Sequence, residues 1–149
     1  MKSLFQKEFL TEITSRIEKL TPDTQHVWGS MNVNQMLAHC SVGMQTANGE
    51  KYLKSSPFLK LIGRMFKSQT TNDKPFRHGS PTHPGFIIGN TETFESEKQK
   101  LISLINKFHD DGPSKVTADS HAFFGKLSPT QWSSLMYKHL DHHLRQFGV

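Results

Sequence analysis

The stretch SPTQWSSLMYKHLDHHLRQFG, residues 128–148, decides the fold class. Ser128 supplies an N-cap, Pro129 fits the first helical position and Gln131 stands third, so a helix begins here. Apolar side chains then recur at helical spacing as far as Phe147-Gly148. This stripe consists of Trp132, Leu135, Met136, Leu140, Leu144 and Phe147. A helix of about 19 residues spans about 28 Å, a length that suits the packing of several long helices.

Two further amphipathic helices are predicted in the first third of the chain. Residues 3–20 carry a periodic apolar stripe that stops before Thr21-Pro22-Asp23, because proline cannot continue a helix. A second helix begins near Asn32, since Asn32 and Gln35 stand three apart as in a capping box. Asn48-Gly49 marks its end.

The remaining helix covers residues 91–109, with Thr91 and acidic residues at its start, and Asp110-Asp111-Gly112-Pro113 ends it. Strand alternation is absent apart from a weak segment, Phe86-Ile87-Ile88. Four helices with one long crossover between the second and third match a four-helix bundle better than a solenoid, which would repeat in sequence. We therefore predict an all-α chain that forms one domain over residues 1–149.

Composition narrows the class of protein. The chain has 149 residues, of which 34 % are hydrophobic, enough for one buried core. No apolar run approaches the ~20 residues of a membrane-spanning helix, and charges interrupt the N-terminus where a secretory signal is apolar. We expect a cytoplasmic protein with no membrane partner. The lone Cys40 excludes an internal disulfide and a Cys-rich zinc module, and we expect it to be a small buried residue.

The formal net charge of +5 comes from residues 51–77, which hold seven Lys and Arg against Asp73. A solvated face is one interpretation of this basic segment, and an electrostatic funnel for an anionic ligand is the other. A nucleic-acid partner is disfavoured because no known nucleic-acid-binding motif accompanies the charge. Within the segment, residues 57–67 are amphipathic and are expected to pack over the helices rather than lie on a membrane. Residues 69–90 are predicted to form a lid or binding loop, because so long a connection without secondary structure is uncommon within one domain.

The strongest chemical signal is three histidines within residues 139–143. At about 100° per residue, His139 and His143 fall inside the apolar stripe, while His142 lies to its flank and Asp141 points nearly opposite. Two imidazoles one turn apart on an inward face are suited to hold one metal ion. The alternative is a pair of core histidines, which requires partners for four ring nitrogens. Nothing matches H-E-x-x-H, so a metalloprotease is disfavoured.

Periodicity alone does not decide the direction or the role of the other candidate residues. His39 lies beside the apolar stripe of its helix and faces either a neighbouring helix or solvent. Gln146 either hydrogen-bonds a bound ligand or water, or is exposed near the terminus. Trp28 and Trp132 are expected to be packing anchors.

Five motifs of the chain match the pattern of a known family: Trp28-Gly29, Gln35-Met36-Leu37-Ala38-His39, Phe123-Phe124-Gly125-Lys126-Leu127-Ser128, Gln131-Trp132 and Tyr137-Lys138-His139-Leu140-Asp141-His142-His143-Leu144-Arg145-Gln146-Phe147-Gly148. In these motifs the chain resembles the DinB/YfiT-like superfamily of metalloenzymes, and within it a branch described as a domain of unknown function. The resemblance spans nearly the whole chain, with the C-terminal block the most specific part and residues 50–80 the least.

This resemblance implies a four-helix bundle that binds a divalent metal ion (zinc, nickel, iron or manganese) through His39, His139 and His143. His121 matches the family pattern less well, because the branch often has proline after this histidine and this chain has Ala122. We retain it as a pocket-lining candidate, with capping of its own loop as the alternative. The other pocket-lining candidates are His142, Gln146 and Trp28. Superfamily members include thiol-dependent transferases and isomerases, which implies thiol chemistry with a low-molecular-weight thiol, and dimers are common among them.

Three neutral imidazoles leave the charge of a divalent ion uncompensated and keep positions open for water or substrate. Such an ion activates water for hydrolysis or a thiolate for group transfer. The sequence contains no clear general base, so the catalytic residue stays unknown. Three hypotheses follow: a metal-dependent enzyme acting on a small-molecule substrate, a metal- or ligand-binding stress-response protein without turnover, and an anion or nucleic-acid binder acting through residues 51–77.

Overall fold

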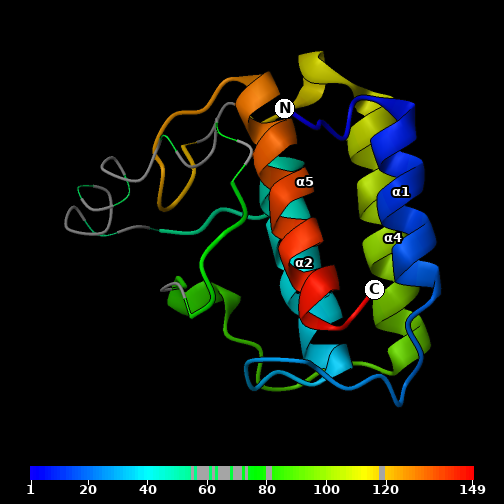
Figure 1. Cartoon of the computed structure of the whole chain (residues 1–149). Helices are drawn as coiled ribbons and strands as arrows, with labels where there is room; N and C mark the ends of the chain where they lie inside the picture. The colour runs from blue at the N-terminus through cyan, green and yellow to red at the C-terminus, as the bar shows by residue number, and fades with distance from the viewer. Residues whose placement is uncertain are drawn as a thin grey trace.

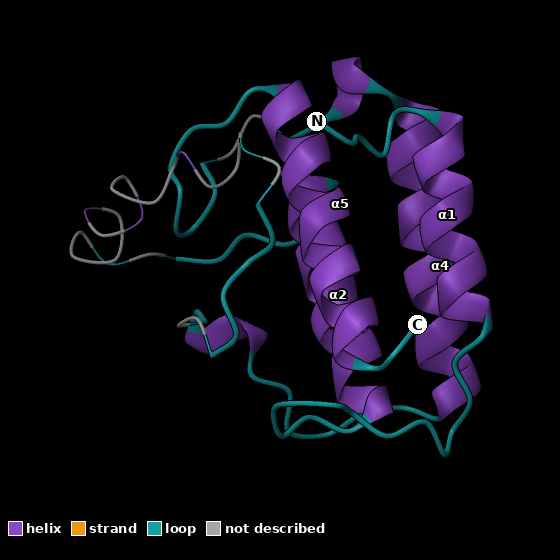
Figure 2. Cartoon of the chain, in the orientation of Figure 1, coloured by secondary structure: helices purple, strands orange, loops and turns teal. Residues whose placement is uncertain are grey.

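The computed structural model in Figure 1 is all-helical in the part of the chain that it describes. That part comprises residues 1–54, 56, 61, 63, 68, 72, 74–79, 82–117 and 120–149. The α-helices are α1 (Lys7–Glu18), α2 (Val33–Ala47), α4 (Phe94–Asp111) and α5 (Pro129–Gln146), and the short 3-10 helices are η2 (Pro84–Phe86) and η3 (Pro113–Lys115). Figure 2 shows no strand in these ranges, so the prediction of an all-α class is confirmed.

The four α-helices bury one common apolar core. Helix α2 packs against α4 and α5, and α1 packs against the same two helices. In Figure 1, α5 runs alongside α2 and α1 runs alongside α4. The residues of this core that are 2 % exposed or less include Leu4, Ile13, Ile17, Leu20, Met36, Leu37, Cys40, Met44, Leu101, Ile105, Phe108, Trp132, Leu140 and Leu144. The expectation that Cys40 is a small core residue is therefore confirmed, as is that of a buried Trp132.

The predicted capping box at Asn32 and the predicted N-cap at Ser128 are both present, and the structure shows a second capping box at Ser128. The side chain of Asn32 accepts from Gln35 N at 2.9 Å, and the Gln35 side chain accepts from Asn32 N at 3.0 Å. Ser128 Oγ accepts from Gln131 N at 3.2 Å, and Gln131 Oε1 accepts from Ser128 N at 2.9 Å. Each box satisfies two backbone N–H groups that the helix itself leaves unpaired.

The first predicted helix is wrong at its ends, because α1 covers only Lys7–Glu18 of residues 3–20. Long-range hydrogen bonds hold the residues before it in another conformation. Ser3 Oγ lies 2.8 Å from Ser133 Oγ on α5, and His109 Nδ1 on α4 donates to the Leu4 carbonyl at 2.7 Å. The N-terminal segment thus closes one end of the core instead of extending the helix.

The helix predicted for residues 91–109 begins three residues later and ends two residues later, since α4 covers Phe94–Asp111. Its N-cap is Thr93, whose side chain accepts from Ser96 N, rather than Thr91. Glu97 Oε1 accepts from Glu92 N at 3.0 Å, which secures the chain just ahead of the cap. At the other end Gly112, with φ of 66°, follows the last helical residue, Asp111.

Parts of the long connection between α2 and α4 are described. Phe86 of the weak strand segment lies in η2, and Ile87 and Ile88 belong to no strand. Of residues 57–67, only 61 and 63 are described, so the predicted packing of this amphipathic stretch lies outside the described residues. The same holds for most of the basic segment 51–77. None of the helices in the described ranges combines the length and apolar composition needed to cross a bilayer.

Ion pairs hold Asp141 of α5 against α1. Arg16 on α1 lies 2.8 Å from Asp141 on α5, and its second terminal nitrogen donates to the carbonyl of Val149 at 2.9 Å. Arg145, one turn further along α5, also pairs with Asp141 at 2.9 Å. The acid therefore lies toward α1. Its phase on the helix predicts only that it points away from the apolar stripe.

Replacing Ser128 with Ala removes the side-chain acceptor of the α5 N-cap. We expect the free energy of unfolding to fall by about 1 kcal/mol and the melting temperature by about 2–4 °C. Chemical and thermal unfolding followed by circular dichroism measure both quantities. Thr130→Ala, also exposed in the first turn, is the matched control; equal destabilisation by the two variants would contradict the capping role.

Candidate metal centre

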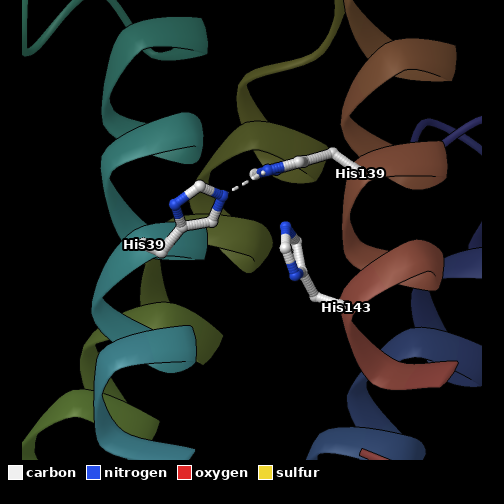
Figure 3. A group of neighbouring side chains, drawn as sticks. All are labelled: His39, His139 and His143. Carbon is white, nitrogen blue, oxygen red and sulfur yellow. Dashed lines mark hydrogen bonds between the residues drawn. The ribbon is translucent and has the colours of Figure 1, made fainter. Parts of the chain in front are cut away.

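Three histidines from two helices converge on one point, as Figure 3 shows. His39 projects from α2, and His139 and His143 project toward it from α5. One ring nitrogen from each lies within 4.8 Å of the others. The closest approach is 2.9 Å, between Nε2 of His39 and Nε2 of His139. The structure thus brings together the three residues that sequence and resemblance singled out.

The direction of the α5 pair follows from the burial of its helix. Leu140 and Leu144, which directly follow the two histidines in sequence, are only 1 % and 2 % exposed. Because residues one turn apart share a face, His139 and His143 are carried to the same side of α5. His142 lies outside this group of three.

Gly43 on α2 makes room for the His139 ring, and sequence reasoning missed it. A Cβ atom built on Gly43 would lie 3.1 Å from Nδ1 and 3.2 Å from Cε1 of His139. Glycine inside a helix costs about 1 kcal/mol relative to alanine, so its place here needs a packing reason. The signal available in the sequence was a mid-helix glycine one turn after His39.

A backbone carbonyl orients His39. Its Nδ1 lies 3.0 Å from the carbonyl oxygen of Phe86, which accepts only, so Nδ1 carries the proton. In the neutral ring Nε2 then holds the lone pair that faces His139 and His143. In the 2.9 Å contact between the two Nε2 atoms, His139 is accordingly the donor. Helix η2, in the connection between α2 and α4, provides this carbonyl.

Gln146 orients His143 in the same way. Its Oε1 accepts from Nδ1 of His143 at 2.8 Å, while its Nε2 donates to the Trp28 carbonyl at 2.8 Å. The second bond fixes which end of the amide faces the histidine, and it leaves Nε2 of His143 with the free lone pair. Gln146 is only 4 % exposed, so the alternative of surface exposure is wrong. Gly29 has a φ of 87°, and a Cβ there would lie 2.3 Å from Gln146 Nε2, which explains the glycine after Trp28.

The three imidazoles are held neutral. Burial away from water lowers the pKa of His39. Burial and the neighbouring ring of His39 together lower the pKa of His143 to about 3. Burial and the neighbouring rings of His143 and His39 bring the pKa of His139 well below its usual range. The neutral ring is the form that can coordinate a metal, so these three side chains could serve as ligands near pH 7.

The three histidines line a cavity of about 850 Å³. The four other candidates, Trp28, His121, His142 and Gln146, also line it. His121 combines the two roles weighed for it, because its Nδ1 also accepts from the backbone N–H groups of Phe123 and Phe124 at 3.1 and 3.2 Å.

An aromatic cluster forms one wall of the cavity. Trp28 stacks on His78, with ring centroids 4.0 Å apart and planes at 13°. His142 contacts this pair and Phe76 edge-on, at about 6 Å between centroids. Phe76 and His78 belong to residues 69–90, which the sequence predicts as a lid or binding loop, and both line the cavity. The sequence does not single out either residue, since only the fold brings this connection against α5.

Acid should destabilise the protein partly through His121. Burial lowers its pKa from 6.5 to about 4, so between these values the unfolded chain binds more protons and stability falls as pH falls. His121→Asn keeps a hydrogen-bond acceptor without titrating in this range. We expect the loss of unfolding free energy between pH 7 and pH 5, measured by urea unfolding with a chelator, to shrink by about 1–2 kcal/mol.

His26→Asn, at an exposed position, controls for the loss of one histidine from the unfolded chain. Equal pH dependence in wild type and His121→Asn would refute the role of His121.

Comparison with known proteins gives a family. A family model described as "Protein of unknown function (DUF1569)" matches residues 2–148. No curated protein and no solved structure matches the chain. Because the match covers nearly the entire sequence, the chain belongs to the DUF1569 family of proteins of unknown function.

Proposed function

We propose that this protein binds a divalent metal ion through His39, His139 and His143 and is a metal-dependent enzyme acting on a small molecule. The observation that carries the proposal is the convergence of the three imidazoles inside a cavity. We assign the fold to the DinB/YfiT-like four-helix bundles, which the motif resemblance and the packing of α1, α2, α4 and α5 support.

The donor set fits a first-row divalent ion. Imidazole nitrogens bind such ions at about 2.0–2.1 Å, so two of them on one ion lie about 3 Å apart. His39 and His139 already present their Nε2 atoms 2.9 Å apart. Two of the three rings direct an unprotonated Nε2 inward, since the Phe86 carbonyl and Gln146 occupy the opposite nitrogens. Such hydrogen bonds from outside the ligand set are typical of metal-binding histidines.

The cavity favours an enzyme over a protein that only stores metal. A storage or structural site is closed by its ligands, whereas a catalytic site keeps positions open. In the described residues only three histidines form the group, and His139 is not fully buried. The adjoining space of about 850 Å³ accommodates a small molecule. A divalent ion on three neutral imidazoles supplies a Lewis acid that activates water or a thiolate.

Substituting any one of the three ligands with Ala should abolish metal retention while preserving the helical fold. The reason is that two imidazoles alone hold a divalent ion far more weakly than three. Metal content by elemental analysis and helicity by circular dichroism provide the two readouts. His142→Ala is the matched control and should retain metal. Full metal content in His139→Ala or His143→Ala would refute the ligand set.

Gln146→Leu should weaken metal binding about 10- to 100-fold without removing a ligand. The variant loses the acceptor that holds His143 Nδ1, so the ring is free to turn and to change tautomer. Competition against a chromogenic chelator measures the dissociation constant. Gln25→Leu, at an exposed position away from the cavity, controls for the loss of an amide. An unchanged dissociation constant in Gln146→Leu would show that Gln146 does not orient the ligand.

A further inference from the structure

The loop before α5 holds His121 in one orientation at the wall of the cavity. The backbone of His121 pairs with that of Gly125 through hydrogen bonds of 2.9 and 3.1 Å. A φ of 72° at Gly125 lets the chain turn back so tightly. The His121 ring packs against the rings of Phe124 and of Trp132 on α5, at centroid distances of 5.0 and 5.1 Å. Contacts on both sides therefore fix the plane of this imidazole.

The same loop decides which nitrogen of His121 carries the proton. Nδ1 accepts from the backbone N–H groups of Phe123 and Phe124, so this nitrogen holds a lone pair. Burial, with a smaller contribution from the nearby His83, lowers the pKa of His121 to about 4, so at pH 7 the ring is neutral and has one N–H. That proton is on Nε2, across the ring from the loop. His121 thus turns a hydrogen-bond donor, and no acceptor, away from its own loop.

No described residue accepts a hydrogen bond from this Nε2. It is also not one of the buried side-chain atoms without a partner in the described part of the chain, so it reaches the open space that His121 lines. His83 offers a comparison, because it lines the cavity too and its Nδ1 accepts from Gly85 N at 3.0 Å. Its Nε2, however, donates to the carbonyl of Lys54 at 2.8 Å. Of these two histidines, only His121 keeps its N–H for the cavity.

His121 lies beside the group of three histidines, along the same face of α5. Trp132, which its ring contacts, precedes His139 by seven residues, or nearly two turns, so both project from one side of the helix at an axial separation of about 10 Å. Leu135 and Met136 come between them and line the cavity. Burial is the main cause of the low pKa of His139, and the nearby ring of His121 contributes to it. His121 is not a member of the group itself.

This placement defines the shape and polarity of a ligand. A molecule that reaches from the three histidines to His121 passes Leu135 and Met136, so its body is apolar. Its far end meets a neutral N–H that donates and cannot accept. A carbonyl or carboxylate oxygen, which only accepts, matches this N–H, whereas an ammonium group, which only donates, does not.

We propose that His121 is a substrate-binding residue, whose Nε2–H donates a hydrogen bond to a carbonyl-type oxygen of a small molecule bound at its other end to the metal ion. This inference rests on the proposed metal-dependent function and names its substrate class. The substrate has a metal-binding group, an apolar body and an oxygen acceptor at the far end. His121 contacts the substrate and is not a metal ligand.

The tautomer of His121 is tested first, by NMR of the zinc-loaded full chain with isotopically labelled histidine at pH 7.5. The His121 signals are those that His121→Asn removes. We expect an unprotonated Nδ1 and a protonated Nε2, because the backbone of Phe123 and Phe124 donates to Nδ1. A protonated Nδ1 would overturn the proposal, since Nε2 would then be an acceptor.

Binding of matched probes tests the donor itself. Isothermal titration calorimetry on the zinc-loaded chain compares para- and meta-acetylbenzohydroxamate with their isopropenyl counterparts, which have the same shape but lack the carbonyl oxygen. The hydroxamate group binds zinc. We expect at least one acetyl probe to bind about fivefold more tightly than its counterpart, as a neutral hydrogen bond provides.

His121→Asn should abolish this preference and leave zinc content unchanged, because asparagine keeps an acceptor for the loop but has no atom in the place of Nε2. His121→Phe, which keeps a ring against Trp132 and loses the donor, repeats the test should the asparagine variant fold poorly.

His83→Asn is the matched control and should keep the preference, since the Nε2 of His83 already has a carbonyl partner. Equal binding of acetyl and isopropenyl probes by the wild-type chain, or a preference that substitution of His121 leaves unchanged, would overturn the substrate class while zinc retention keeps the metal proposal intact. Failure of the wild-type chain to retain zinc, nickel, iron or manganese would overturn both.

Discussion

Burial of the apolar face of α5 is the constraint on which the rest of the site depends. The stripe that includes Leu140 and Leu144 must face the core, and this fixes the rotation of the helix about its axis. With the rotation fixed, His139 and His143 share one direction, toward α2. The same rotation turns Asp141 toward α1, where Arg16 pairs with it. One packing requirement thus gathers the imidazoles and removes a carboxylate from their neighbourhood.

The site also depends on two hydrogen-bond acceptors that orient His39 and His143 from outside the group of three histidines. The Phe86 carbonyl and the Gln146 amide oxygen each accept a hydrogen bond from Nδ1 of a histidine. The proton therefore stays on Nδ1, and Nε2 keeps its lone pair. Burial keeps the rings uncharged, because a charged imidazole is poorly solvated there. Together these contacts give neutral, oriented nitrogen donors, which would lower the reorganisation required by the metal binding that we propose.

Capping signals within a few residues of each other correctly predicted where α2 and α5 begin. At Asn32 and Ser128 the cap and its partner stand three residues apart, so both caps could be read directly from the chain. The same rules failed where distant groups intervene. Leu4 fits the apolar period of the first helix, yet His109 on α4 binds its carbonyl and holds it outside that helix. Thr91 and Thr93 are both acceptable caps by residue type, and only the folded chain shows that Thr93 is used.

The sequence by itself determined the all-helical class and the inward pairing of His139 and His143, because both follow from periodicity within a single helix. Periodicity left His39 open, since its direction depends on which helix packs beside α2 and at what rotation. The contacts of Gln146 with His143 and Trp28, and the open space around them, were likewise decided only by the tertiary structure. Such contacts join residues far apart in the chain, and their geometry is set by packing rather than by the spacing of residues along it.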